Sequence, residues 1–178
     1  MKHPEKKAKE MTTQELASYI DYSVLKPEFT PEQIIELTKD GVQLGCASIC
    51  INPGYMELCK PYVEGSKTKL CPVCDFPFGT SSTESKVAQA KILVDKYADV
   101  ISELDIVSNF GKIRAGLYSH GATPEIIKVM QEEVKDKCQV KGSGCIRTRE
   151  HFLQLIDMGI DRMGVGYRSV PVVLDLKK

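Results

Sequence analysis

An alternation of helical and apolar segments is the feature that most constrains the fold of this chain. Amphipathic stretches rich in Glu, Lys and Gln end near a Gly, Ala or Asp. Each then runs within a few residues into a short apolar segment, as in DGVQLGCASICINP, KYADVISELDIVSNFG and DMGIDRMGVGY. This alternation is typical of parallel sheets whose strands are connected by helices, and it predicts an α/β fold. The six predicted strands cover residues 19–25, 46–51, 69–76, 100–107, 138–141 and 162–165.

Helix-start signals precede several of the amphipathic stretches. A short helix is predicted near the N-terminus, and longer ones are predicted to begin near Pro31, Pro53, Thr83, Thr123 and Arg149. Thr30 and Thr148 stand where an N-cap side chain is expected. Because no low-complexity linker divides the 178 residues, the sequence predicts a single domain over residues 1–178, with residues 1–11 as a solvated tail.

The charge balance limits the classes of partner. Lys+Arg and Asp+Glu both total 24, so no overall field favours nucleic acid or an anionic membrane, and any bound anion requires a local site. No apolar stretch approaches the ~20 residues of a membrane span, and the charged N-terminus lacks an apolar region behind it. The chain is therefore predicted to be cytoplasmic. Its seven cysteines are expected to stay reduced.

Polar residues collect where the predicted strands end. They are Lys26, Asn52, Asp75, Asp105, Asn109 and Lys141. In parallel α/β folds, active sites are built at the carboxyl ends of the strands, so this edge is predicted to be a catalytic mouth. Solvation of strand ends is an alternative explanation for Lys26, Asn52 and Asn109. It fits Asp105 and Lys141 less well, because each lies within an apolar run and needs a partner to stay charged. Asp105 and Lys141 are predicted to lie close together at this mouth, each as the nearest opposite charge of the other.

The turn after Lys141 reads KGSGCIRT, with Gly142, Ser143 and Gly144 ahead of a predicted helix. Backbone N–H groups of such a turn and the positive end of the helix dipole favour a phosphate group. A plain loop without a ligand remains an alternative, because short glycine turns are common.

The spacing of Cys71 and Cys74, one strand after Cys46 and Cys50, raises the alternative of a zinc or redox site. In an extended strand, residues three apart point to opposite faces, so the two sulfurs do not converge without a bulge. The pattern therefore favours cysteines of the core, and no metal or other cofactor is expected.

Six segments resemble deoxyribose-phosphate aldolase, in the order of that family: IDYSVLKPEFTPEQI, ASICINPGYM, CDFPFGTSSTESKVAQA, ELDIVSNFGKIRAG, GATPEIIKVM and KGSGCIRTREHFLQLIDMGIDRMGVG. The resemblance extends from about Tyr19 to Gly166. It implies a (β/α)8 barrel that reversibly cleaves 2-deoxy-D-ribose 5-phosphate to D-glyceraldehyde 3-phosphate and acetaldehyde. The implied reaction belongs to deoxyribonucleotide catabolism, proceeds through a lysine Schiff base and uses no metal.

The same resemblance implies roles for individual residues. Asp105 matches the proton-relay aspartate of the family, and Lys141 matches its second active-site lysine, which lowers the pKa of the nucleophile. Residues that match the pocket lining and the phosphate end are Asp21, Cys50, Gly144, Arg147 and Gly164. The implied partner is a small sugar phosphate. A homodimer is the assembly that we expect.

The chain departs from the family most clearly at the nucleophile. The family strand that reads close to V-K-T-S-T-G-F is missing, since the sequence passes from GKIRAG through Leu117 to GATPE. A barrel of ~250 residues uses roughly 30 for each βα unit, so two missing units amount to about 60. The sequence therefore predicts an incomplete barrel without the fifth and sixth strands and without the Schiff-base lysine.

Smaller departures involve glycines and hydroxyls. Cys145 and Asp75 each stand where the family has a glycine, and Tyr22 replaces a histidine. The final strand reads Gly164-Val165-Gly166-Tyr167 in place of a run close to G-T-S-S, so two hydroxyls expected near the phosphate are lost.

Two hypotheses remain open. In the first, the chain is an aldolase by family whose nucleophile strand is missing from this sequence. In the second, it is a non-catalytic relative that binds a sugar phosphate or a partner chain. A solvated lysine with a pKa near ~10.4 is neutral in only about one molecule in a few thousand at pH 7. No retro-aldol turnover and no borohydride-trapped adduct at Lys141 are therefore expected.

Overall fold

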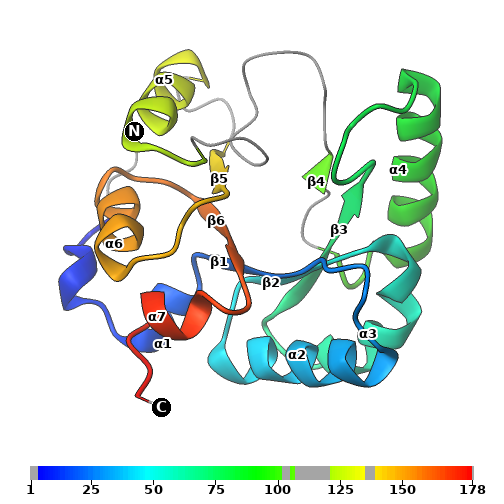
Figure 1. Cartoon of the computed structure of the whole chain (residues 1–178), viewed down its shortest axis with the longest axis horizontal. Helices are drawn as coiled ribbons and strands as arrows, with labels where there is room; N and C mark the ends of the chain where they lie inside the picture. The colour runs from blue at the N-terminus through cyan, green and yellow to red at the C-terminus, as the bar shows by residue number, and fades with distance from the viewer. Residues whose placement is uncertain (1–3, 102–104, 107–120, 135–138, 178) are drawn as a thin grey trace. The chain divides into compact units, whose positions relative to one another are not determined.

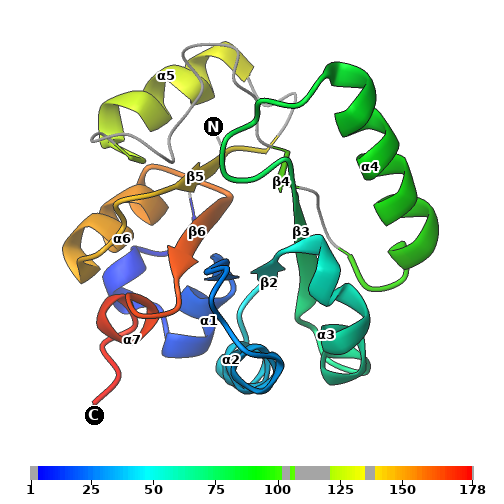
Figure 2. The same ribbon diagram turned by 45° about the vertical axis from the view of Figure 1, so that its right-hand side comes forward.

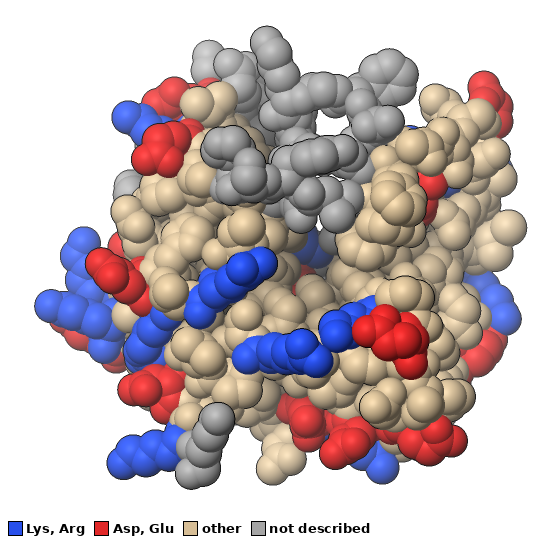
Figure 3. All heavy atoms as spheres, in the orientation of Figure 1, with Lys and Arg blue, Asp and Glu red and all other residues tan. Residues whose placement is uncertain are grey.

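The computed structural model describes residues 4–101, 105–106, 121–134 and 139–177, which form two compact units (Figure 1). The terminal unit contains residues 1–21 and 114–178, and the central unit contains residues 22–113. Strand β1 (Ile20–Val24) runs across the boundary, with Asp21 the last residue of one unit and Tyr22 the first of the next. Basic and acidic side chains both reach the face shown in Figure 3, in keeping with the zero net charge.

The central unit contains parallel strands connected by helices. β2 (Ser48–Ile51) pairs with β3 (Lys69–Cys74), and β3 pairs with β4 (Asp105–Ile106). In this register Ser48 is opposite Lys69 and Val73 is opposite Asp105. The helical segments are α2 (Pro31–Leu44), the 3₁₀ turn η2 (Pro53–Tyr55), α3 (Met56–Val63) and α4 (Thr83–Tyr97).

Local sequence signals explain both ends of α2. The Thr30 hydroxyl accepts from Gln33 N at 3.3 Å and the Gln33 side chain accepts from Thr30 N at 2.9 Å, which forms a capping box. The helix ends at Gly45, whose φ of 76° is the left-handed conformation that glycine adopts without strain. A Cβ at Gly41 would collide with Ile49 of β2, so this glycine lets the helix pack closely on the strand.

The terminal unit has the same alternation. β5 (Lys141–Ser143) pairs in parallel with β6 (Arg162–Gly166), and Met163 N donates to Tyr19 O at 2.8 Å, which places the start of β1 beside β6. Figure 2 shows α6 beside these strands. The helical segments are the 3₁₀ turn η1 (Ala8–Glu10), α1 (Thr13–Ala17), α5 (Pro124–Val134), α6 (Arg149–Asp157) and α7 (Val170–Val173).

The two faces of β5 and β6 differ in character. Met163 and Val165 are buried, whereas Arg162 and Gly164 are partly exposed, as expected because alternate strand residues share a face. On β5, a Cβ at Gly142 would lie 3.0 Å from Ile127 of α5, so Gly142 faces the helices. The opposite face therefore carries Lys141, Ser143, Arg162 and Gly164, and the candidate site lies there.

Most predicted elements are confirmed, but β5 is displaced. Its predicted range ends at Lys141, whereas the observed strand begins there. The Val140 N–H donates to the Asp161 carboxylate at 2.8 Å, so a side chain takes this donor and the regular ladder starts one residue later. Lys141 is consequently the first residue of the strand.

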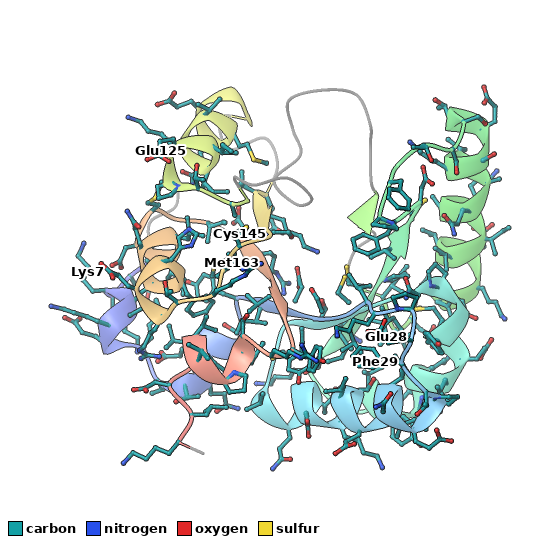
Figure 4. The ribbon with its side chains drawn as sticks, viewed as in Figure 1. Lys7, Glu28, Phe29, Glu125, Cys145 and Met163 are labelled. Carbon is teal, nitrogen blue, oxygen red and sulfur yellow. The ribbon has the colours of Figure 1, made fainter. Side chains whose placement is uncertain are left out.

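The expectation of a solvated N-terminal tail is wrong for part of residues 1–11. Lys6, Lys7 and Lys9 are exposed, and Figure 4 shows Lys7 projecting away from η1. Ala8, however, is fully buried, and its N–H donates to the Asp157 carboxylate of α6 at 2.8 Å. This bond and the burial of the small side chain tie η1 to α6.

The thiols in the described part of the chain are free. Five of them are buried as core residues: Cys46, Cys50, Cys59, Cys71 and Cys74. Across the described ranges, no group of three His, Cys, Asp or Glu side chains is arranged to hold a metal ion. Of the helices that the structure describes, none has the length and apolar character needed to cross a membrane.

Candidate active site

The centre of the candidate site is an ion pair between Lys141 and Asp21. The Lys141 Nζ lies 3.0 Å from Asp21 Oδ2. The Asp21 side chain is completely buried, whereas the Lys141 side chain keeps 20% of its surface exposed. Asp21 comes from the second position of β1 and Lys141 from the first position of β5. A buried carboxylate needs such a partner to stay ionised, and the partly exposed ammonium remains accessible to a ligand.

Arg162 extends this pair to a third charged group. Its Nη1 lies 3.8 Å from Asp21 Oδ1, the second oxygen of the same carboxylate. The register places Arg162 directly opposite Lys141 on neighbouring strands. Like charges in that arrangement repel each other, and the buried Asp21 carboxylate, which is close to both, offsets that repulsion.

Ser143 and Gly164 form the next pair along the same face. They are opposite each other in the register of β5 and β6. A Cβ at position 164 would collide with the Ser143 hydroxyl oxygen. The glycine therefore makes room for this hydroxyl on the face that also carries Lys141 and Arg162.

The turn from β5 to α6 is held against the start of α5. Ala122 N donates to Gly144 O at 3.0 Å, and a Cβ at Gly121 would lie 2.6 Å from Gly144 O and 2.5 Å from the Cys145 Cβ. Gly144 and Cys145 both have left-handed φ angles, 87° and 60°. Figure 4 shows Cys145 on this turn.

The helix after the turn starts as the sequence predicts. The Thr148 hydroxyl accepts from His151 N at 3.3 Å, which confirms Thr148 as the N-cap of α6. Arg147, immediately before it, is exposed.

The terminal unit therefore contains five of the seven predicted site residues: Asp21, Lys141, Gly144, Arg147 and Gly164. Cys50 lies in the central unit, buried in β2 against Cys71 and Val73. Asp105 lies in β4 of that unit, and its side chain falls outside the described residues. The predicted closeness of Asp105 to Lys141 thus remains a prediction.

Arg162 is a member of the site that the predictions omit. A signal was present, because Arg162 opens the predicted strand 162–165, and a charge beside the apolar residues of a strand needs a partner. The sequence could not show which partner, since the approach to Asp21 depends on how β1, β5 and β6 align.

No family model matches the chain. The deoxyribose-phosphate aldolase of Clostridium kluyveri is 29% identical over 86% of this chain and 95% of its own length. That of Staphylococcus saprophyticus is 28% identical over 83% and 91%, respectively. Deoxyribose-phosphate aldolases are homologues of this chain. The structure of deoxyribose phosphate aldolase from Aeropyrum pernix, described as a unique tetramer, has a TM-score of 0.76 at 21% identity and covers 92% of this chain and 91% of that one. It shares the fold, which confirms a barrel-type α/β class.

The comparison with the aldolase homologues also supports the missing segment. The alignment with the Clostridium kluyveri aldolase runs over 210 positions but uses 86% of 178 residues, about 153, which leaves about 57 positions without a counterpart here. This number agrees with the roughly 60 residues expected for two βα units. Six strands are present in the residues that the structure describes, as an incomplete barrel requires.

Proposed function

We propose that this chain is a lyase-family protein of the deoxyribose-phosphate aldolase type whose site binds 2-deoxy-D-ribose 5-phosphate. In that family, the sugar phosphate is cleaved reversibly to D-glyceraldehyde 3-phosphate and acetaldehyde through a lysine Schiff base. The observation that carries the proposal is the Lys141–Asp21 ion pair beside the glycine turn, in a chain whose homologues are these aldolases.

Each predicted site residue of the terminal unit has a role in this proposal. The Lys141 ammonium donates hydrogen bonds to a substrate oxygen, and the buried Asp21 holds it in place. The turn at Gly144 and the start of α6 receive the phosphate, with Gly164 leaving space and Arg147 supplying charge. Cys50 is expected to line the pocket and Asp105 to relay protons, as the resemblance implies.

The chain as written is expected to bind without cleaving. It lacks the V-K-T-S-T-G strand, so Lys141 is the remaining candidate for an imine-forming amine. An opposite charge at 3.0 Å favours the protonated form of a lysine, which is not a nucleophile. The ion pair therefore adds a second reason, beyond the missing strand, to expect no turnover.

Binding and turnover can be measured separately. Isothermal titration calorimetry with 2-deoxy-D-ribose 5-phosphate should show saturable binding that Lys141→Met weakens at least about tenfold, since hydrogen bonds to charged groups are worth about 1.5–3 kcal/mol. Lys91→Met, which removes an exposed lysine of α4, is the matched control and should bind normally. Equal affinity in both variants, or no binding at all, contradicts the proposal.

A retro-aldol assay on the same preparation should give no rate above background, and acetaldehyde with borohydride should give no selective adduct at Lys141. Stoichiometric labelling of Lys141 that Lys141→Met abolishes would show that this lysine acts as the nucleophile. Aldolase activity would then belong to the chain as written.

A second candidate function is a non-catalytic relative that binds a partner chain, and the roughly 57 unmatched alignment positions favour it. The sequence of the messenger RNA distinguishes the two candidate functions. A transcript that encodes a V-K-T-S-T-G strand between Gly116 and Gly121 favours the aldolase, whereas a transcript without it favours the relative.

A cytoplasmic homodimer is part of the proposal. Analytical ultracentrifugation tests the homodimer, and cell fractionation tests the cytoplasmic location.

A further inference from the structure

Ser143 is a polar residue of the site face that the proposed binding function does not yet use. It is the only residue with a hydroxyl group in β5 and β6, whose sequences are KGS and RMGVG. It is the last residue of β5, at the carboxyl end of the strand, and it is partly exposed. In barrels of this type, ligands bind at that end of the strands.

The neighbouring strand sets the direction of the Ser143 hydroxyl. Gly164 is directly opposite Ser143 in the register of β5 and β6, so the two residues share a face. A Cβ at position 164 would collide with Ser143 Oγ and would lie 3.1 Å from the Ser143 Cβ. The hydroxyl therefore occupies space beside β6 that only a glycine at position 164 leaves open.

The position of Ser143 along β5 places it between the two ends of the proposed ligand. Lys141 is two residues earlier on the same face, and the strand rise puts the two Cα atoms about 6.6 Å apart. Gly144, with a φ of 87°, follows at once and begins the turn proposed to receive the phosphate. Lys141 is proposed to meet an oxygen of the sugar. The part of the sugar chain between that oxygen and the phosphate then lies beside Ser143.

We propose that Ser143 is a specificity-determining residue whose side chain forms a hydrogen bond with a hydroxyl group of the sugar, and that Gly164 is the positioning residue for this contact. A serine hydroxyl donates and accepts, as a sugar hydroxyl does. A phosphate is bound more strongly by charged side chains and by N–H groups of the turn. This inference rests on the proposed function, because it names the part of the sugar phosphate that Ser143 recognises.

Two ligands separate the hydroxyl contact from the other contacts. They are 2-deoxy-D-ribose 5-phosphate and 5-oxopentyl phosphate, which keeps the aldehyde and the phosphate but lacks both chain hydroxyls. In isothermal titration calorimetry, Ser143→Ala should weaken binding of the sugar phosphate about three- to tenfold, the effect of one neutral hydrogen bond. The same variant should bind 5-oxopentyl phosphate as the wild type does. The wild-type preference for the sugar phosphate should therefore narrow by that factor.

Ser18→Ala is the matched control in the same unit. The Ser18 hydroxyl donates to Glu15 O at 2.7 Å at the end of α1, in an exposed position. Its removal should leave the affinities for both ligands unchanged. A melting curve of each variant shows that the protein is folded before the titration.

A double-variant cycle tests the role of Gly164. Gly164→Ala should weaken binding of the sugar phosphate, because the new Cβ displaces the Ser143 hydroxyl. In the Ser143→Ala background, the same substitution should cause less than half of that loss on a logarithmic scale. An equal loss in both backgrounds would show that Gly164 does not act through the hydroxyl, which overturns its positioning role. If Gly164→Ala does not fold, the two-ligand comparison of Ser143→Ala decides the proposal.

The possible failures can be told apart. A Ser143→Ala variant that loses affinity equally for both ligands overturns the inference, because the serine then contacts a group that the ligands share. Unchanged affinity for the sugar phosphate overturns it as well and leaves the proposed function intact. If the wild-type protein does not bind the sugar phosphate, the proposed function and this inference are both wrong.

Discussion

Two loops of this molecule have the same unusual backbone conformation and use it in opposite ways. Asp75 follows β3 and has a φ of 58°, and Cys145 follows β5 and has a φ of 60°. Both positions correspond to glycines in the aldolase resemblance, and a left-handed backbone suits glycine but strains most other residues. The two positions therefore differ in whether side-chain contacts offset the backbone strain.

At Asp75, side-chain contacts offset the backbone strain. Its carboxylate accepts from Ser81 N at 2.9 Å and Ser81 Oγ at 2.8 Å, and Lys86 Nζ lies 3.3 Å away. Burial opposes ionisation of this carboxyl, but the Ser81 hydrogen bonds and the Lys86 ammonium outweigh burial and lower its pKa. The carboxylate thus closes the loop that leads into α4.

At Cys145, the described residues provide no comparable side-chain contact that would offset the strain. Its side chain is exposed, and within the described residues its thiol has no hydrogen bond. Its Cβ sits close to Gly121, where an additional side-chain carbon would lie only 2.5 Å away. The same φ angle is therefore compensated at Asp75 and uncompensated at Cys145, so substitution by glycine should have opposite signs at the two sites.

The largest effect is expected for Asp75→Ala. Alanine keeps the left-handed strain but loses both Ser81 hydrogen bonds and the Lys86 contact. We expect the melting temperature to fall by roughly 5–8 °C, from the typical 2–4 °C per kcal/mol for a chain of this size. Differential scanning calorimetry measures it, and Asp95→Ala on the exposed face of α4 is the control with no expected change.

Asp75→Gly sharpens the comparison, since glycine loses the same hydrogen bonds but removes the strain. The melting temperature should fall by only about half as much as in Asp75→Ala. A larger loss with glycine than with alanine would mean that backbone strain at Asp75 is negligible. The contrast with Cys145 would then rest on hydrogen bonds alone.

Cys145→Gly should have a smaller effect of opposite sign. Relief of the left-handed strain should raise the melting temperature by about 1–3 °C, because no hydrogen bond is lost. Cys145→Ala removes the sulfur but keeps the strain, so it should melt like the wild type. Destabilisation by glycine would show that the Cys145 side chain makes a contribution that its exposure does not suggest.

The contrast also shows which features a sequence can reveal. The αβ alternation and the N-caps Thr30 and Thr148 depend on neighbouring residues, and the structure confirms them. The start of β5 depends on Asp161, more than twenty positions away, and was misplaced. The approach of Arg162 to Asp21 depends on strand register, which no local pattern encodes.

The smallest effect concerns the pH dependence that Asp75 contributes. Its pKa in the folded protein is lowered from the ordinary value of 3.8. The ionised carboxylate therefore stabilises the fold fully above that value, and the contribution is lost as the pH falls through the lower folded pKa. Asp75→Asn removes this ionisation while keeping a side chain of similar shape.

The melting temperatures of wild type and Asp75→Asn should therefore differ by a constant amount above about pH 5 and begin to converge as the pH falls below about 4. The expected difference at neutral pH is about 1–3 °C, because the amide oxygen still accepts from Ser81 while the Lys86 attraction is lost. Cys145→Gly serves as the reference, since this substitution neither adds nor removes a group that ionises at low pH. A gap between wild type and Asp75→Asn that does not narrow as the pH falls below 3.8 would mean that the carboxylate acts by its shape and hydrogen bonds, with its charge contributing nothing to the loop.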